Sequence, residues 1–226
     1  MSSSGHGAQA RDLERPRQLA TPHCTRDTLA PVPDEAGLRR RLVACGMELL
    51  EEATPEQLTL RAVARRAGVS HGAPRRHYPT WASLLSAIAA QGFEDLREQL
   101  MPALTAPARR PLERLRAAAQ AYAAFAAERP GLFAVMFRHD LLHHPGSDLR
   151  ATSLPVLQDI VALVELAQRE QGWRAEEPSL GLASALWSSI HGQTLLSLWG
   201  ALPVATGEPD PSPVLTTILD VFLERP

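Results

Sequence analysis

The apolar residues of this chain recur at helical spacing along nearly its whole length. Within residues 35–52, Leu38, Leu42 and Cys45 are three or four positions apart, so they share one face of an amphipathic helix. No segment alternates apolar and polar residues between hairpin turns, as the strands of a half-buried sheet do. We therefore expect an all-α chain with about nine helices.

Breaks in this pattern divide the chain into three parts. Residues 1–33 mix Ser, Gly, Pro and charged residues without apolar periodicity, which predicts a disordered tail. Residues 34–96 hold a first helix, two short ones and a fourth. Residues 97–226 hold longer apolar-faced helices, which predicts a larger helical domain.

Composition excludes several classes of protein. No stretch of about 18 apolar residues runs without polar breaks, and the N-terminus lacks the charged start and apolar core of a signal peptide. The two cysteines, Cys24 and Cys45, provide neither a disulfide framework nor a CxxC spacing. We therefore expect a cytoplasmic protein that does not associate with membranes.

Positive charge is concentrated in one segment of a chain whose formal net charge is −2. The segment from Leu58 to Tyr78 contains no Asp or Glu. Its basic residues are Arg61, Arg65, Arg66, His71, Arg75, Arg76 and His77. Because a solvated face normally mixes both signs, an acid-free basic segment on a mildly acidic protein indicates a site for a polyanion.

The same segment has the properties of a helix-turn-helix. Gly68 suits a sharp turn after the first short helix, because glycine tolerates a left-handed backbone. Val69 is expected to fill the angle between the two helices, and Ser70 is expected to cap the second one. Gly72 and Ala73 are small, so the start of that helix can approach a DNA groove closely. The basic residues that follow would then reach phosphates or base edges.

From Thr59 to Pro74, with the His77-Tyr78 pair that follows, the sequence resembles the tetracycline-repressor (TetR) family of bacterial transcription regulators. The resemblance extends from Leu38 to about Phe93. It implies a three-helix head that binds double-stranded DNA, on a body that dimerises and binds a small molecule. The function implied is that of a repressor which its ligand releases from a pseudo-palindromic operator.

The candidate DNA-contacting residues follow from the basic segment and from this resemblance. They are Thr59, Arg61, Ser70, His71, Gly72, Ala73, Arg75, Arg76, His77, Tyr78 and Trp81. Two of them depart from the family pattern, in which an aromatic residue is usual at the position of Arg75 and a lysine at that of Trp81. An arginine keeps a phosphate contact and an indole N–H can still donate, so we expect DNA binding to persist.

A second resemblance lies in the C-terminal half. The stretch Trp187-Ser-Ser-Ile-His191-Gly192 matches a Trp-x-x-x-His-Gly signature of one subgroup of TetR-like C-terminal domains. Trp187 and His191 are four residues apart and share a helix face. The architecture that the family implies places an apolar effector pocket between helices of the body. The candidate pocket residues are Tyr122, Phe125, Phe133, Met136, Phe137, Trp187 and His191.

Two apolar helices near the C-terminus, 178–201 and 213–224, predict the contact between two copies of the chain. They carry more apolar surface than a single body of this size needs, which favours pairing across a two-fold axis. The candidate dimer-interface residues are Leu195, Leu198, Leu215, Ile218 and Phe222. Two recognition helices would then meet half-sites about 34–36 Å apart.

Two further motifs leave an alternative open, that of a helical metal-binding or hydrolytic protein with a vestigial helix-turn-helix. Residues 68–72 spell GxSxG, but a nucleophile elbow needs a strand before its serine, and none is expected here. His139 and His143 have a spacing that can hold a metal, without a third ligand in view. We therefore expect no enzymatic activity, no catalytic residue, no cofactor and no metal site.

Overall fold

The computed structural model describes residues 35–52, 57–142 and 149–224, and these contain eleven helices and no strand. The all-α prediction is confirmed, and the difference from about nine helices comes from two short ones, α7 and α10. The tail predicted for residues 1–33 lies outside the described residues. The helices are α1 (Glu35–Glu52), α2 (Leu60–Arg66), α3 (Ala73–His77), α4 (Trp81–Thr105), α5 (Pro111–Glu128), α6 (Pro130–Met136), α7 (His139–Leu142), α8 (Leu149–Gln171), α9 (Ser179–Leu198), α10 (Ala201–Thr206) and α11 (Ser212–Leu223).

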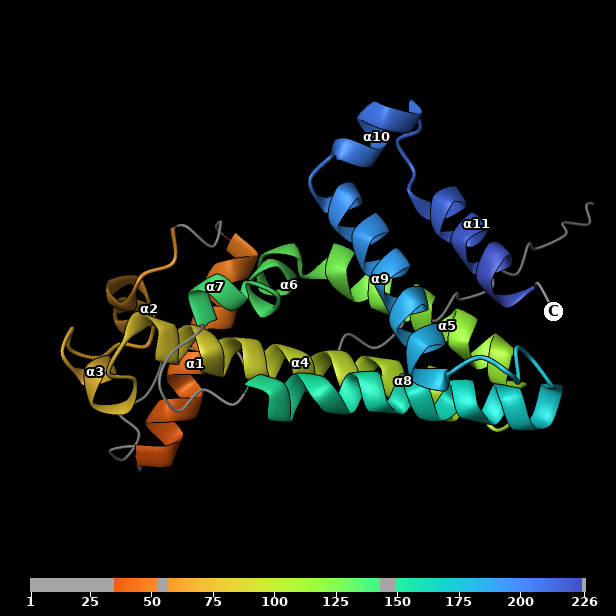
Figure 1. The fold of residues 1–226 in the computed structure, drawn as a ribbon. Helices are drawn as coiled ribbons and strands as arrows, with labels where there is room; N and C mark the ends of the chain where they lie inside the picture. The colour runs from red at the N-terminus through yellow and green to blue at the C-terminus, as the bar shows by residue number, and fades with distance from the viewer. Residues whose placement is uncertain (1–34, 53–56, 143–148, 225–226) are drawn as a thin grey trace, which may run out of the picture.

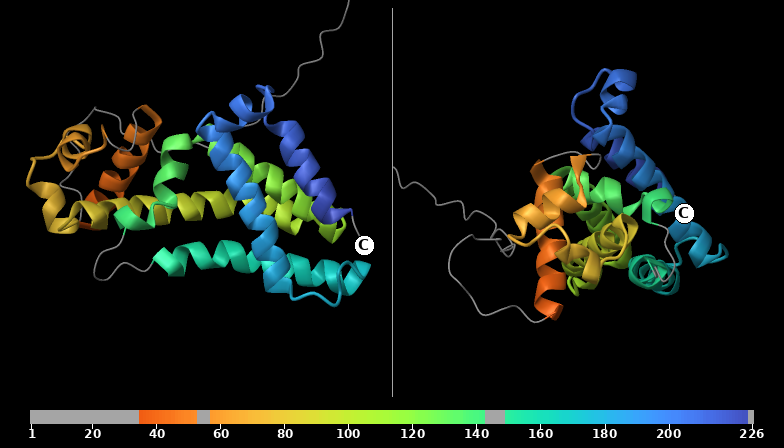
Figure 2. Two further views of the ribbon diagram at one scale, coloured as in Figure 1. Left: turned by 45° about the horizontal axis from the view of Figure 1, so that its top comes forward. Right: turned by 90° about the vertical axis from the view of Figure 1, so that its left-hand side faces the viewer.

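The long helix α4 joins the two ends of the molecule (Figure 1). Helices α1, α2 and α3 form a head at its N-terminal end, while α5 and α8 pack along the rest of it. Helices α9, α10 and α11 project from one side of this bundle (Figure 2). The boundary expected between residues 96 and 97 falls inside α4, so head and body share one continuous helix.

A capping box fixes where α4 begins. The Thr80 hydroxyl accepts a hydrogen bond from the Ser83 N–H at 3.0 Å, and the Ser83 hydroxyl accepts one from the Thr80 N–H at 3.2 Å. These two bonds satisfy N–H groups that the first turn of a helix leaves without partners. The buried face of α4 then continues from Leu84 to Leu104 in a single apolar core that head and body share.

Helix α6 is locked against the C-terminal end of α1. Gly131 packs so closely there that a Cβ atom on it would clash with the backbone carbonyl oxygen of Leu50. Beside it, the Arg129 guanidinium lies 2.6 Å from Asp95 of α4 and 3.6 Å from Glu51 of α1. One short helix is therefore tied to the head and to the central helix together.

None of the described helices combines the length and the hydrophobicity that crossing a bilayer requires.

The close approach at Gly131 predicts a specific stability defect. In a Gly131→Ala variant the added methyl group must push α6 away from a backbone atom, which cannot rotate aside. We expect a loss of about 1–3 kcal/mol in the free energy of unfolding, measured by urea denaturation. Gly181→Ala is the matched control, since its Cβ would meet only Pro178 at 3.9 Å. Equal stability of the two variants would contradict the tight α1–α6 contact.

Candidate nucleic-acid interface and effector pocket

Local hydrogen bonds shape the turn between α2 and α3. The Thr59 hydroxyl caps α2 by accepting from the Ala62 N–H at 3.1 Å. After α2, Gly68 has φ +68°, the left-handed conformation that a glycine adopts without strain. The turn therefore has the backbone expected of a helix-turn-helix.

Ser70 does not cap α3 with its side chain, in contrast to the prediction. The N-cap of α3 is Gly72, without a side-chain cap, and Ser70 instead accepts the Ala73 N–H through its backbone carbonyl, at 3.0 Å. Pro74 stands in the first turn of α3, where its missing N–H costs nothing. The Ser70 hydroxyl is left exposed on the outer side of the turn.

Most of the candidate DNA-contacting residues lie at the surface of the head. Those classed as exposed are Thr59, Arg61, Ser70, His71, Gly72, Arg75 and Arg76. Ala73 and His77 are half-buried. A Cβ atom on Gly72 would meet no protein atom within 4 Å, so the fold itself does not require a glycine there. The start of α3 thus presents bare backbone to an incoming partner.

Tyr78 and Trp81 are placed differently from the other candidates. Tyr78 is 4% exposed, and the Arg39 guanidinium of α1 covers its ring at 4.9 Å from the centroid. Burial raises the pKa of Tyr78, and its hydroxyl donates to the Arg39 carbonyl at 3.4 Å. Trp81 packs against the core and is half-buried. Tyr78 therefore holds α3 against α1 and offers almost no surface to a ligand.

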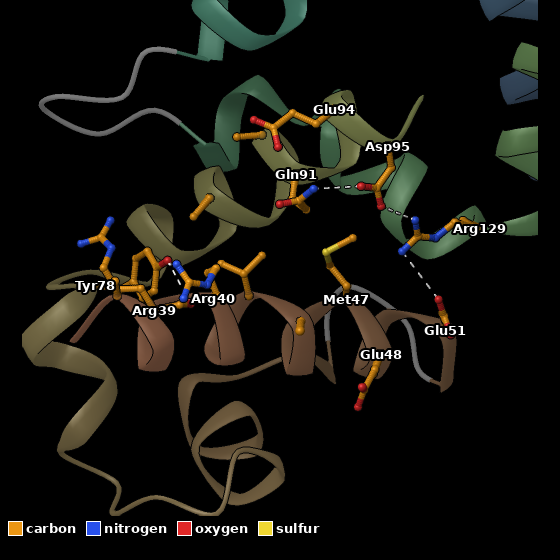
Figure 3. Close-up of a pocket in the computed structure, with 15 residues that line it drawn as sticks. Arg39, Arg40, Met47, Glu48, Glu51, Tyr78, Gln91, Glu94, Asp95 and Arg129 are labelled. Atoms are coloured by element: carbon orange, nitrogen blue, oxygen red, sulfur yellow. Dashed lines mark hydrogen bonds and ion pairs between the residues drawn. The ribbon is translucent and has the colours of Figure 1, made fainter. Parts of the chain in front are cut away.

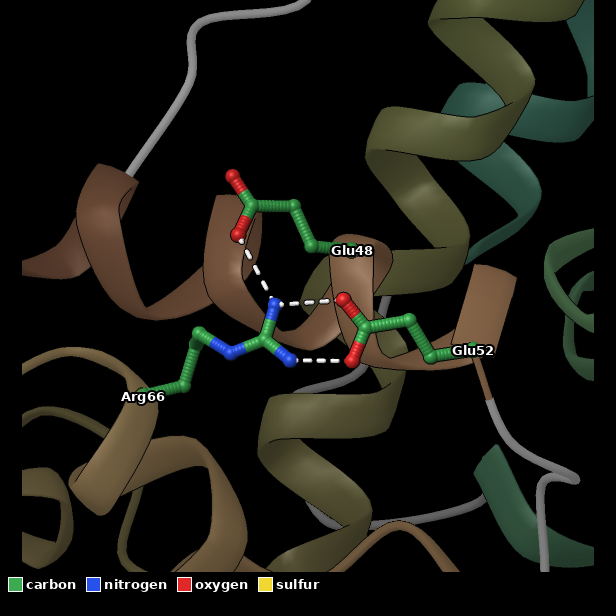
Figure 4. A network of polar contacts seen from close by, with 3 residues as sticks. All are labelled: Glu48, Glu52 and Arg66. Atoms are coloured by element: carbon green, nitrogen blue, oxygen red, sulfur yellow. Dashed lines mark hydrogen bonds and ion pairs between the residues drawn. The ribbon is translucent and has the colours of Figure 1, made fainter. Parts of the chain in front are cut away.

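Arg66 differs from the other arginines of the basic segment. It reaches back to α1, pairing with Glu48 at 3.4 Å and, through two hydrogen bonds, with Glu52 (Figure 4). The bond from Arg66 lowers the pKa of Glu52. Sequence reasoning missed this pairing because the two acids lie outside the segment from Leu58 to Tyr78.

Four arginines of α2 and α3 carry uncompensated charge. Within the described part of the chain, no acid pairs with these side chains: Arg61, Arg65, Arg75 and Arg76. All four are exposed. An exposed cationic surface without internal partners is the electrostatic footprint of a polyanion site.

A groove of about 590 Å³ runs between α1 and α4 (Figure 3). Arg39, Arg40 and Tyr78 lie at one end of it, and Glu51 and the Arg129–Asp95 ion pair lie at the other. No motif in the sequence pointed to this groove.

A second cavity, of about 200 Å³, lies in the body among α4, α5, α8 and α9. Of the seven predicted pocket residues, Tyr122, Phe137 and Trp187 line this cavity. Phe93 of α4 and the apolar face of α8 complete the wall, and sequence reasoning had not selected them. The sequence shows the helical periodicity of α8, but it does not show toward which neighbouring helices the apolar face of α8 turns.

Phe133 and His191 stand behind this wall, in contact with the lining rings. His191 shares a 2.7 Å hydrogen bond with the Tyr122 hydroxyl, and its ring lies 4.4 Å from Phe137 and 5.4 Å from Trp187, centroid to centroid. Phe133 lies 5.6 Å from the same imidazole. Burial lowers the pKa of His191 and raises that of Tyr122, so both groups are neutral at pH 7.

Phe125 and Met136 do not line the cavity. Phe125 is 1% exposed, and the Arg129 guanidinium lies over its ring at 5.8 Å from the centroid. Met136 is fully buried against Gly92, where a Cβ atom would come within 2.8 Å of its sulfur. Both residues pack near the α1–α6 contact instead.

The five dimer-interface residues predicted on α9 and α11 pack against the core of the single chain to different extents. Leu215 is 8% exposed and packs inward, and the other four candidates are half-buried against the core: Leu195, Leu198, Ile218 and Phe222. The large apolar side chains exposed nearby are Leu196, Trp199, Val204 and Val221, with Trp199 70% and Val204 86% exposed. Leu195, Leu198, Ile218 and Phe222 keep part of their surface exposed, so their place in a dimer interface stays a prediction.

The structure describes only one of the two motifs behind the alternative function in full. A helix precedes Ser70, in contrast to the strand that a nucleophile elbow requires. His139 begins α7, while His143 lies outside the described residues. Among the residues described, no three His, Cys, Asp or Glu side chains come together as metal ligands would.

Comparison with known proteins finds one family match, in the C-terminal half of the chain, and several similar solved structures. Residues 115–222 match the family described as tetracyclin repressor-like, C-terminal domain. A search of curated proteins finds no match. A solved protein of unknown function from Rhodococcus sp. RHA1 is 30% identical, with 83% of this chain and 94% of that chain covered and a TM-score of 0.70.

Two further solved structures carry functional names. A Thermus thermophilus FadR, described as a TetR family transcriptional repressor in complex with lauroyl-CoA, is 25% identical, covering 82% of this chain and 93% of that one, with a TM-score of 0.58. A possible TetR family transcriptional regulator from Streptomyces coelicolor A3(2) is 20% identical, covering 82% and 97%, with a TM-score of 0.63. This last likeness concerns the fold alone.

The buried imidazole predicts a pH dependence of stability. An unfolded histidine titrates near pH 6.5, whereas the pKa of His191 in the folded protein lies lower. Stability is therefore complete above about pH 6.5 and is lost as the pH falls toward the folded pKa, because the unfolded chain takes up a proton first. We expect the melting temperature to fall less between about pH 7.5 and pH 5.5 in His191→Gln than in the wild type. Parallel falls would contradict the depressed pKa.

Proposed function

We propose that this chain, which belongs to the TetR family of transcriptional regulators, is a repressor that a small molecule releases from its operator. Regulators of this family are not enzymes, which leaves no role for Ser70 as a nucleophile. DNA is bound by α2 and α3, with residues 34–96 as the DNA-binding part. The effector enters the cavity lined by Tyr122, Phe137 and Trp187 in the part formed by residues 97–226.

The unpaired charge on the head carries the DNA proposal. Arg61, Arg65, Arg75 and Arg76 find no acid within the described residues, whereas Arg66 is neutralised by α1. Arginines held apart from acids release counterions when they meet phosphates, which drives binding. The open backbone at the start of α3 lets that helix approach the major groove.

The exposed apolar side chains of α9, α10 and α11 support a homodimer. Leu196 on α9, Trp199 directly after it and Val221 on α11 are exposed, and Figure 2 shows that α9, α10 and α11 project from one side of the bundle. Small residues, Ala185 and Ser188, continue the exposed face of α9 and allow a second helix to come close. A two-fold axis through this face would present two copies of α3 to a pseudo-palindromic operator.

Helix α6 connects the effector cavity to the head. Phe133 on α6 and Phe137 directly after it belong to the aromatic cluster, and Gly131 on the same helix abuts Leu50 of α1. A ligand that displaces Phe137 therefore moves α6, and α6 moves α1. By linkage, effector and DNA weaken each other's binding by the same factor.

Removing charge from α3 tests DNA binding. We expect an Arg75→Ala/Arg76→Ala double variant to bind DNA from the flanks of its own gene more weakly. We also expect its log–log salt slope to be flatter by about 1.8, since each phosphate contact contributes about 0.9. The measurement is fluorescence anisotropy over a salt series. Arg109→Ala is the control, because Arg109 is an exposed arginine between α4 and α5. An unchanged slope in the double variant would remove both residues from the interface.

Placing charge on the outer face of α9 tests the dimer. A Trp199→Glu variant puts a carboxylate on the face proposed to be buried between two copies, so we expect a monomer that binds a full operator poorly. The measurement is sedimentation velocity together with DNA binding. Leu141→Glu on α7 is the control, since Leu141 is 37% exposed on another part of the surface. A dimer that persists in Trp199→Glu would place the interface elsewhere.

A further inference from the structure

We propose that the effector is an amphipathic anion, with a narrow aliphatic tail in the 200 Å³ cavity and an acidic head group on Arg150. This inference rests on the proposal that the cavity is the effector site. It adds the chemical class of the effector and the residue that selects it.

The interior of the cavity is lined almost entirely by apolar side chains. Leu154, Leu157 and Ile160 of α8 face the aromatic rings of Phe93 and Trp187 across it. The Tyr122 hydroxyl is already engaged by His191 at 2.7 Å. A ligand that fills this space therefore needs an apolar body, because a polar group there would lose its water without gaining a partner.

Arg150 supplies the charge at the solvent end. It is exposed, Ser153 one turn further along α8 is half-buried, and Val156 is buried, so the cavity deepens along the helix from Arg150 inward. Both Arg150 and Ser153 line the cavity. A ligand with its tail at Val156 would thus have its head beside the guanidinium.

Arg150 has no acidic partner among the described residues, and unlike Arg109, which has none either, it lines the cavity. Several other arginines of the body are held by carboxylates: Arg97 by Asp159 at 2.6 Å, Arg116 by Asp220 at 2.7 Å, and Arg174 by Glu177 at 3.0 Å. A guanidinium is always charged and binds carboxylate or phosphate through two parallel hydrogen bonds. An unpaired one at the mouth of an apolar cavity favours a ligand with an anionic end.

The size of the cavity limits the shape of the tail. Pockets for drug-sized molecules measure roughly 300–1,000 Å³, so a volume of about 200 Å³ suits a chain better than a fused ring system. A smaller apolar void, of about 30 Å³, shares Tyr122, Ile160 and Trp187 with the cavity and continues toward Leu186. The two spaces adjoin at these three residues, none of which is Arg150 or Ser153 at the solvent end.

The test compares probes that share a tail and differ in their head. Decanoate, decyl phosphate and decanol are titrated into the full-length protein and binding is measured by calorimetry. The intrinsic tryptophan fluorescence, to which Trp187 in the cavity wall contributes, is followed as a second signal. We expect at least one anion to bind about tenfold or more tightly than decanol. In Arg150→Gln that preference should fall to within about twofold while decanol binding is kept. The anion that gains most identifies the head as carboxylate or phosphate.

Two further variants locate the site. Arg109→Gln removes an exposed arginine outside the cavity and should retain the full preference for the anion. Leu157→Trp fills the cavity from α8 and should abolish binding of all three probes. Equal wild-type affinity for anion and alcohol, a preference that survives Arg150→Gln, or no binding of any probe would each overturn the inference.

The same experiment separates this inference from the proposed release mechanism. If an anion binds in an Arg150-dependent way but leaves DNA binding unchanged, the ligand assignment stands and release by this ligand fails. If no probe binds while DNA binding persists, the proposed ligand class is wrong and the proposed function as a DNA-binding regulator stands.

Discussion

The contact between α1 and α6 fixes the head of the molecule to its body. Gly131 brings α6 against the backbone of Leu50, and Arg129 joins the end of α1 to the middle of α4 through Glu51 and Asp95. Because interiors are close-packed, two helices at such a distance cannot slide without moving their neighbours. The head is therefore fixed to the body at two places: along α4, and at the junction with α6.

The aromatic cluster connects the junction at α6 with the wall of the cavity. Phe133 packs against Tyr122 and His191, and Phe137 both lines the cavity and lies beside His191. Their rings are stiff and contact one another edge to face or tilted, so a ligand that displaces one ring displaces its neighbours. The neutral pair of Tyr122 and His191 lies among these rings without bringing charge into the core.

The sequence predicts correctly the structural features that local chemistry determines. It does not predict the contacts that depend on packing between distant segments. The bounds of α1, the left-handed turn at Gly68 and the burial of Cys45 all follow from residue type and spacing. The pairing of Arg66 with acids on α1 was invisible, because it joins residues 14 and 18 positions apart. Tyr78 has a hydroxyl that could donate to a phosphate, but its ring is buried in the core. Leu215 likewise has the right period for α11, but the period alone does not say which apolar face turns inward.

The continuity of α4 joins the cavity wall directly to the part of the chain that is proposed to bind DNA. Phe93 in the cavity wall lies about 18 Å from the start of the helix at Trp81, at 1.5 Å per residue. A tilt of about 10° at Phe93 therefore shifts the head by about 3 Å. In the proposed homodimer, two such shifts in opposite directions would change the separation of the two α3 helices by about 6 Å, against a half-site spacing of about 34–36 Å. A rigid helix would thus convert a small change at the cavity into a difference between the separation of the two α3 helices and the spacing of the half-sites.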